Sequence, residues 1–233
     1  MLDIEKLTKK EIASLIDHTF LKPNGKAEWI ENLCNEAHEH GFAMVAVNPA
    51  EVKTCVRLLK ESTVRVGAAV GFPLGQSTLK VKLFETREAI ALGAKEIDMV
   101  INQRAVRCGD FDLVKKEIGS LVSACKPYSV ISKVILECCN LIDSEKIKVC
   151  QIAKGEGCDY VKTSTGFSRL GATVEDVRLM RETVGPSMGV KASGGIRNLD
   201  QTLAMIKAGA SRIGTSSGVT IMDELKQRAN INH

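Results

Sequence analysis

Two lysines and an aspartate stand where a β-strand would turn them away from its apolar side chains. Lys162 follows Val161, Lys191 follows Val190, and Asp98 lies between two apolar neighbours in the same way. Successive residues of a strand face opposite sides of a sheet. The three ionisable groups are therefore expected on one face and their apolar neighbours on the other. Two amines and a carboxylate on one buried face predict nucleophilic chemistry or proton transfer.

The amine of a lysine attacks a carbonyl carbon only when it carries no proton. At an unperturbed pKa near 10.4, about one lysine in 2,500 is neutral at pH 7. Burial and a neighbouring ammonium both disfavour the charged form and lower the pKa. We therefore expect Lys191 to lower the pKa of Lys162, Lys162 to form a Schiff base, and Asp98 to transfer protons. The alternative is a structural ion-pair network in which Asp98 is only a counter-ion.

The same alternation turns further polar groups toward this face. In the segment 132–137 it directs Lys133 and Glu137 inward, and at the end of the segment 95–102 it directs Asn102 inward. Asp17 and Thr19, two residues apart, face the same way and are expected to line the same pocket. Asp17 has a second possible role, which is to balance the charge of a lysine.

Two glycine-rich loops near the carboxyl terminus are typical of a phosphate site. Glycine lets the backbone N–H groups approach an anion, and serine before a helix caps its first turn. Each glycine alone could be only a turn residue, whereas two such loops in succession are more specific. The predicted phosphate-binding residues are Gly166, Gly194, Gly195, Arg197, Gly214, Ser216 and Ser217. The alternative for Arg197 is an exposed side chain that contacts only solvent.

Short β-rich segments alternate with longer amphipathic ones along the whole chain. The strands are expected near 17–20, 43–48, 65–70, 95–102, 132–137, 159–162, 189–192 and 211–214. The helices are expected near 9–16, 27–40, 50–60, 79–92, 110–125, 144–155, 174–184, 199–207 and 217–228. This order predicts an α/β fold, a (β/α)₈ TIM barrel with a short extra N-terminal helix, as one domain over 1–233. An open, doubly wound sheet is the alternative.

Composition disfavours several classes of protein. The 32 basic and 28 acidic residues leave a net charge of +4 with no basic block, so we expect no nucleic-acid partner. The charged first ten residues and the lack of a long apolar run predict no membrane association and a cytoplasmic location.

The eight cysteines have no Cys-x-x-Cys spacing and are expected to be reduced. His38 and His40 are two residues apart, so we expect neither a helical zinc pair nor another metal site, and no nucleotide-cofactor motif occurs.

Taken together, these segments resemble the deoxyribose-phosphate aldolase family over almost the whole length. The resemblance rests on the segments 17–19, 70–75, 96–102, 133–137, 161–167, 189–197 and 214–217. It implies a class I aldolase without a cofactor that cleaves 2-deoxy-D-ribose 5-phosphate to D-glyceraldehyde 3-phosphate and acetaldehyde, and it suggests a homodimer. It assigns the Schiff base to Lys162, the lowering of its pKa to Lys191 and proton transfer to Asp98, and it assigns the phosphate to the loops described above. Other lysine aldolases or transaldolases, and a catalytically silent sugar-phosphate sensor, are the alternatives.

Three departures from the family pattern bear on function. Ala46 stands three residues before Pro49, where many relatives carry a cysteine. The chain ends in His233 and lacks the terminal tyrosine of many relatives. The segment 103–108 replaces a glycine-containing one, so the shape of this loop is open. The missing thiol predicts better tolerance of acetaldehyde.

Overall fold

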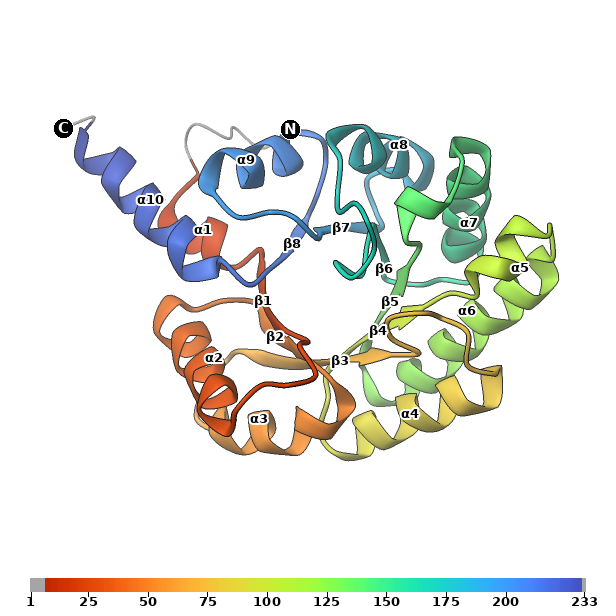
Figure 1. The fold of residues 1–233 in the computed structure, drawn as a ribbon, viewed down its shortest axis with the longest axis horizontal. Helices are drawn as coiled ribbons and strands as arrows, with labels where there is room; N and C mark the ends of the chain where they lie inside the picture. The colour runs from red at the N-terminus through yellow and green to blue at the C-terminus, as the bar shows by residue number, and fades with distance from the viewer. Residues whose placement is uncertain (1–6, 232–233) are drawn as a thin grey trace.

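Eight parallel strands close into a barrel in the computed structural model, which describes residues 7–231 (Figure 1). Each strand pairs with the next in the sequence, and β8 pairs with β1, where Asp17 lies opposite Gly214. That last pairing excludes the open sheet. The strands are β1 (Ile16–Phe20), β2 (Met44–Val47), β3 (Arg65–Val70), β4 (Glu96–Val100), β5 (Ile131–Ile135), β6 (Tyr160–Lys162), β7 (Gly189–Ser193) and β8 (Arg212–Thr215).

The helices form a ring outside the strands (Figure 1). They are α1 (Lys9–Ala13), α2 (Ala27–His40), α3 (Val52–Leu58), α4 (Leu79–Ala91), α5 (Gln103–Arg107), α6 (Phe111–Cys125), α7 (Asp143–Gly155), α8 (Val174–Val184), α9 (Leu199–Lys207) and α10 (Gly218–Ile231). Short 3₁₀ turns cover η2 (Pro49–Glu51), η3 (Lys126–Tyr128) and η4 (Cys138–Asn140). No helix of residues 7–231 is long and apolar enough to cross a membrane.

Local sequence sets where several of these helices begin and end. The side chains of Asp110, Thr173 and Asn198 accept a hydrogen bond from the backbone N–H three residues later, which caps α6, α8 and α9. Gly41 ends α2 with a φ of 68°, a left-handed conformation that glycine adopts without a steric penalty. These signals are local, which explains why the bounds of several helices could be predicted closely.

Apolar strand residues face the helices, as alternation predicted. Ile97, Met99, Val134, Val161 and Val190 all belong to the apolar core between barrel and helices, and each is fully buried. The opposite face of the strands is therefore left to the barrel interior. All eight cysteines are free thiols, six of them buried.

The barrel and its leading helix confirm the predicted fold, and three local differences have simple causes. α1 ends at Ala13 because the chain is already in β1 at Ile16. α3 begins at Val52 because the turn that starts at Pro49 is a 3₁₀ helix. The segment after β4 forms the short helix α5, although its sequence predicts no defined loop shape. The side chain of Asn102 caps this helix by accepting a bond from the N–H of Ala105.

Candidate active site

The predicted ionisable groups meet inside the barrel. β6 and β7 place Lys162 opposite Lys191, and β4 and β5 place Asp98 opposite Lys133. Lys133 and Lys191 are fully buried, and Lys162 and Asp98 are each 3% exposed. The strand register thus brings four charged side chains into one enclosed space, as their alternation along the strands predicted.

Asp98 is the centre of this cluster. Its Oδ2 accepts hydrogen bonds from Nζ of Lys162 at 2.8 Å and from Nζ of Lys191 at 2.7 Å, and its Oδ1 accepts one from Nζ of Lys133 at 2.7 Å. Burial alone would raise the pKa of the Asp98 carboxyl, but the three ammonium groups hold this pKa well below its usual value. Asp98 is therefore a carboxylate at neutral pH.

A second set of ion pairs lies toward the amino ends of the strands. Arg212 donates to Asp17 Oδ1 at 2.6 Å and to Glu96 Oε2 at 3.0 Å. Lys133 also lies 2.5 Å from Glu96, and Lys191 lies 2.5 Å from Asp17. Asp17 is thus inside the barrel, as predicted, and it balances a lysine there. Lys133 and Lys191 join the two sets into one network.

The charges of this network balance when Lys162 is neutral. Its fully enclosed part holds three carboxylates, Asp17, Glu96 and Asp98, and three cations besides Lys162, namely Lys133, Lys191 and Arg212. Arg65 reaches Glu96 only from the rim, with its side chain 45% exposed. A proton on Lys162 would add a buried charge without a carboxylate of its own, which is unfavourable.

The pKa of Lys162 is correspondingly lowered, to about 8. Burial is the largest cause, and repulsion from Lys191 and, less strongly, from Lys133 adds to it, while attraction by Asp98 opposes it. Lys191 therefore contributes as predicted, but removal from water contributes more. At a pKa of about 8, roughly one amine in ten is neutral at pH 7, compared with one in 2,500 for a free lysine.

The two predicted phosphate loops after β6 and β7 touch each other through glycines. Gly166 and Gly194 have φ values of 84° and 85°, in the left-handed region. A Cβ on Gly194 would lie 3.3 Å from Cα of Gly166, and one on Gly171 would lie 2.0 Å from the Gly194 carbonyl oxygen. Side chains at Gly194 and Gly171 would force these loops apart. Gly195, with a φ of 78°, is exposed beside them.

The other predicted phosphate residues lie in β8, directly after it, and after β7. A Cβ on Gly214 would lie 2.8 Å from Cβ of Ser193, so β7 and β8 are in close contact there. Ser216 is exposed, and Ser217 directly precedes α10, with its N–H bonded to Thr215 Oγ1 at 2.9 Å. The side chain of Arg197 is exposed after β7. The loops after β6, β7 and β8 thus offer glycines, hydroxyls and a guanidinium at one end of the barrel.

Comparison with known proteins identifies the family. A family model described as DeoC/LacD family aldolase matches residues 12–224. The chain belongs to this family. It is 62% identical to a deoxyribose-phosphate aldolase of Bacteroides thetaiotaomicron over 96% of this chain and 94% of the relative. It is also 54% identical to a deoxyribose-phosphate aldolase of Caldanaerobacter subterraneus over 93% of this chain and 94% of that relative.

Solved structures agree with the family assignment. The chain superposes with a TM-score of 0.90 on a structure described as a unique tetrameric structure of deoxyribose phosphate aldolase from Aeropyrum pernix. The sequence identity is 33%, and the match covers 97% of this chain and 95% of that one. The sequence-based recognition of the aldolase family and of the TIM barrel is confirmed.

Other predicted positions in this aldolase have different outcomes. Thr19 is half-buried, and its hydroxyl donates to the carbonyl of Asp17 at 2.8 Å, so its place in the pocket stays a prediction. The inward orientation of Asn102 is wrong, because β4 ends at Val100 and the Asn102 side chain caps α5 instead. Glu137 is buried and bonds to Thr165 after β6.

Sequence reasoning missed Glu96 and Arg212, although a signal was present. Glu96 lies two residues before Asp98, and Arg212 precedes the apolar Ile213 in a short strand. Both therefore obey the alternation that identified Asp98 and Lys162. Neither suggested chemistry by its residue type, and only the strand register shows that both belong to the same network as Asp98.

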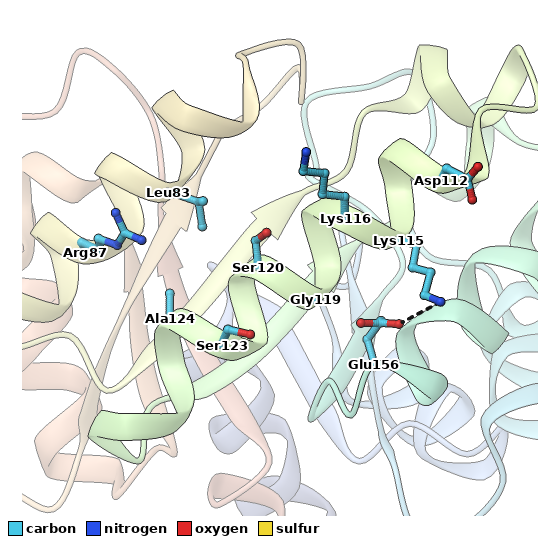
Figure 2. A pocket seen from close by; sticks show the side chains of 10 residues that line it. All are labelled: Leu83, Arg87, Asp112, Lys115, Lys116, Gly119, Ser120, Ser123, Ala124 and Glu156. Carbon is cyan, nitrogen blue, oxygen red and sulfur yellow. Dashed lines mark ion pairs between the residues drawn. The ribbon is translucent and has the colours of Figure 1, made fainter.

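Two cavities differ in their distance from the predicted site residues. A groove of about 510 Å³ between α4, α6 and α7 is lined by Arg87, Lys115, Ser120 and Glu156 among others (Figure 2). It contains none of the predicted site residues, and its Lys115 is paired with Glu156 at 3.8 Å. A smaller cavity, of about 260 Å³, includes Glu137, Thr165 and Phe167 after β5 and β6. Residues 7–231 contain no group of three histidine, cysteine or acidic side chains placed to hold a metal.

Proposed function

We propose that this family member is a class I aldolase that reversibly cleaves 2-deoxy-D-ribose 5-phosphate into D-glyceraldehyde 3-phosphate and acetaldehyde. The observation that carries the proposal is the buried Lys162 amine, with a pKa of about 8, in a network already neutral without it. Such an amine is available as a nucleophile at neutral pH. The names of its relatives support the identity of the substrate.

The reaction begins when Nζ of Lys162 attacks the aldehyde carbon of the open-chain sugar. Loss of water gives an imine, which withdraws electrons from the neighbouring carbon. Removal of the proton from the C3 hydroxyl then breaks the C2–C3 bond and releases D-glyceraldehyde 3-phosphate. The two carbons left on Lys162 form an enamine, which takes up a proton and is hydrolysed to acetaldehyde. Every step needs a proton moved near Nζ.

Asp98 and Lys191 are the groups placed to move these protons. Asp98 Oδ2 lies within 2.8 Å of the Lys162 amine and 2.7 Å of the Lys191 amine, so it can pass a proton between them. Because Asp98 is ionised at neutral pH, we propose that it is the proton acceptor of this pair and that Lys191 is the proton donor. We propose that Lys133 and Asp17, through their ion pairs, hold Asp98 and Lys191 in position, and that Thr19 lines the pocket.

We propose that the phosphate of the substrate binds at the glycine loops. Backbone N–H groups of Gly166, Gly194 and Gly195, the strand residue Gly214, and the start of α10 provide donors without requiring a cation. Ser216 and Ser217 add hydroxyls, and Arg197 adds a charge. This assignment follows the family resemblance and is supported by the contact between the loops after β6 and β7.

Reduction with borohydride in the presence of acetaldehyde tests the proposal. We expect a two-carbon adduct on Lys162, located by mass mapping, and none on the other lysines of the network. The Lys162→Met variant is the matched control and should carry no adduct. An adduct elsewhere, or turnover that persists in this variant, would overturn the proposed mechanism. Product analysis separates this enzyme from a transaldolase, which requires a larger donor than acetaldehyde.

Three further features remain proposals. We propose one domain over residues 1–233 and a cytoplasmic location, which the free thiols support. We also propose a homodimer, since Val81 and Phe84 on α4 are 48% and 67% exposed. Light scattering of the purified chain tests the dimer directly, and a monomer at micromolar concentration would contradict it.

A further inference from the structure

Glu137 has a backbone conformation that its residue type disfavours. Its φ of 57° and ψ of 62° lie in the left-handed region, where glycine is unstrained and a long side chain is not. Among the described residues, only Ser129 shares a positive φ without being glycine. A strained residue other than glycine beside a candidate site suggests that its side chain has a task there.

The side chain of Glu137 reaches the loop after β6. Glu137 is 1% exposed, and its carboxylate accepts hydrogen bonds from the Thr165 N–H at 3.2 Å and from the Thr165 hydroxyl. It forms no ion pair with any cation of the described residues, unlike the carboxylates inside the barrel. The Thr165 hydroxyl oxygen in turn accepts a bond from the N–H of Phe167 at 3.0 Å. This chain of bonds encloses Gly166, which lies between Thr165 and Phe167.

The backbone on both sides of Glu137 is also fixed. The N–H of Leu136 bonds to the carbonyl of Lys162 at 2.9 Å, and the N–H of Cys138 bonds to the carbonyl of Thr163 at 2.9 Å. Glu137 is thus held at the junction of β5 and the segment after β6. Its left-handed conformation directs the carboxylate toward Thr165, while the two backbone hydrogen bonds hold the main chain in place.

We infer that Glu137 is a positioning residue, which fixes the peptide N–H of Gly166 for the substrate phosphate through Thr165. The inference rests on the proposed function, because it requires a phosphate at Gly166. Lys162 lies on β6 itself and is held by strand pairing, so imine formation does not need Glu137. Loss of the carboxylate should therefore weaken recognition of the phosphate and spare the amine.

Two matched variants separate these effects. Glu137→Gln keeps the length of the side chain and one acceptor oxygen for Thr165. Glu137→Asn carries the same amide, tolerates the left-handed conformation, and is one methylene too short to reach Thr165. We expect Glu137→Asn to raise the KM for 2-deoxy-D-ribose 5-phosphate about tenfold, as expected for about one lost hydrogen bond, with kcat within about twofold. Glu137→Gln should recover most of this loss.

Acetaldehyde has no phosphate, so its reaction with Lys162 tests whether the variant leaves the reactivity of this amine unchanged. The acetaldehyde concentration that half-saturates borohydride trapping on Lys162 should be the same in Glu137→Asn and in the natural chain. Equal losses in trapping and in KM, or an unchanged KM, would overturn the inference. If Glu137→Asn does not fold, Glu137→Gly, which relieves the backbone strain, is measured in the same way. Failure of the natural chain to cleave the phosphorylated sugar would instead refute the proposed function.

Discussion

The two ends of the charged network inside the barrel differ in how many carboxylates contact Lys133, Arg212 and Lys162. Toward the amino ends of the strands, each cation contacts two carboxylates: Lys133 meets Glu96 and Asp98, and Arg212 meets Asp17 and Glu96. Toward the carboxyl ends, Lys162 meets only Asp98, and it shares that oxygen with Lys191. All of these groups are buried, so burial alone does not distinguish them.

The difference appears in the pKa values of two lysines that contact the same carboxylate. Burial lowers the pKa of both. For Lys133 the attraction of Asp98 and Glu96 exceeds this effect and raises the pKa above the usual value. For Lys162 the single shared carboxylate is insufficient, and the pKa falls to about 8. The number of carboxylate partners therefore accounts for the opposite directions of the pKa shifts of Lys133 and Lys162.

The largest expected effect is on catalysis at the carboxyl end. Lys162→Met should lower kcat/KM for 2-deoxy-D-ribose 5-phosphate by at least about 10⁴-fold, because it removes the amine that forms the imine. The folded pKa of Lys162 lies below its unfolded value near 10.4, so its burial opposes folding increasingly as the pH falls below about 10.4, and the full penalty is reached below about pH 8. The variant should then be more stable at pH 7 by roughly 1–3 kcal/mol in urea unfolding. A large loss of stability would contradict the charge balance described above.

Lys133→Met should show the opposite pattern at the amino end. It removes the buried cation that Glu96 and Asp98 share, and such a loss typically lowers the free energy of unfolding by about 3–5 kcal/mol. Urea unfolding at pH 7 measures this loss, with Lys162→Met as the matched lysine-to-methionine control. If both variants were equally stable, the distinction between the two ends of the network would be wrong.

A smaller effect is expected when the repulsion on Lys162 is removed. Lys191→Met deletes a neighbouring ammonium and leaves Asp98 Oδ2 to Lys162 alone, and both changes favour the protonated amine. The pKa of Lys162 should rise by roughly one unit. The lower limb of the pH profile of kcat/KM reports this shift, and Lys191→Arg, which keeps the charge, should shift it much less. No shift in Lys191→Met would show that burial acts alone.

The smallest effect concerns a neutral position facing the same interior. Ala46 is paired with Thr19 across β1 and β2 and is 5% exposed. Ala46→Cys should change the free energy of unfolding by less than about 1 kcal/mol and should speed inactivation by acetaldehyde, because a thiol there can trap reactive aldehyde by-products. Activity after timed incubation measures the difference. Equal inactivation of both proteins would refute the tolerance predicted from the missing thiol.

The sequence predicted the residues whose placement depends on strand alternation. Period two separates Asp98 from Ile97 and Met99, and Lys162 from Val161, without any knowledge of the neighbouring strands. It could not show that Glu96 and Arg212 complete the same network, because their contacts depend on the register between strands distant in the sequence. Helix α5 could not be predicted either, since its five residues are too few for a helical period and strand alternation directs its cap, Asn102, inward.

The source of the lowered pKa was predicted only in part. A second ammonium could be inferred from Lys191, but the dominance of burial depends on how completely the closed barrel excludes water from Lys162. The strain at Glu137 was likewise invisible, because nothing in its residue type indicates a left-handed backbone. The face to which a strand residue points can be predicted from sequence, whereas the exclusion of water from the barrel interior and the conformation of a loop cannot.

A direct titration of the Lys162 amine tests the central claim. The chemical shift of ¹³Cε of Lys162, assigned by its absence in Lys162→Met, is followed by NMR from pH 6 to pH 11. We predict a transition with a midpoint at about 8, in the same range as the lower limb of the kcat/KM profile. A midpoint near 10.4, the value of a free lysine, would contradict the account.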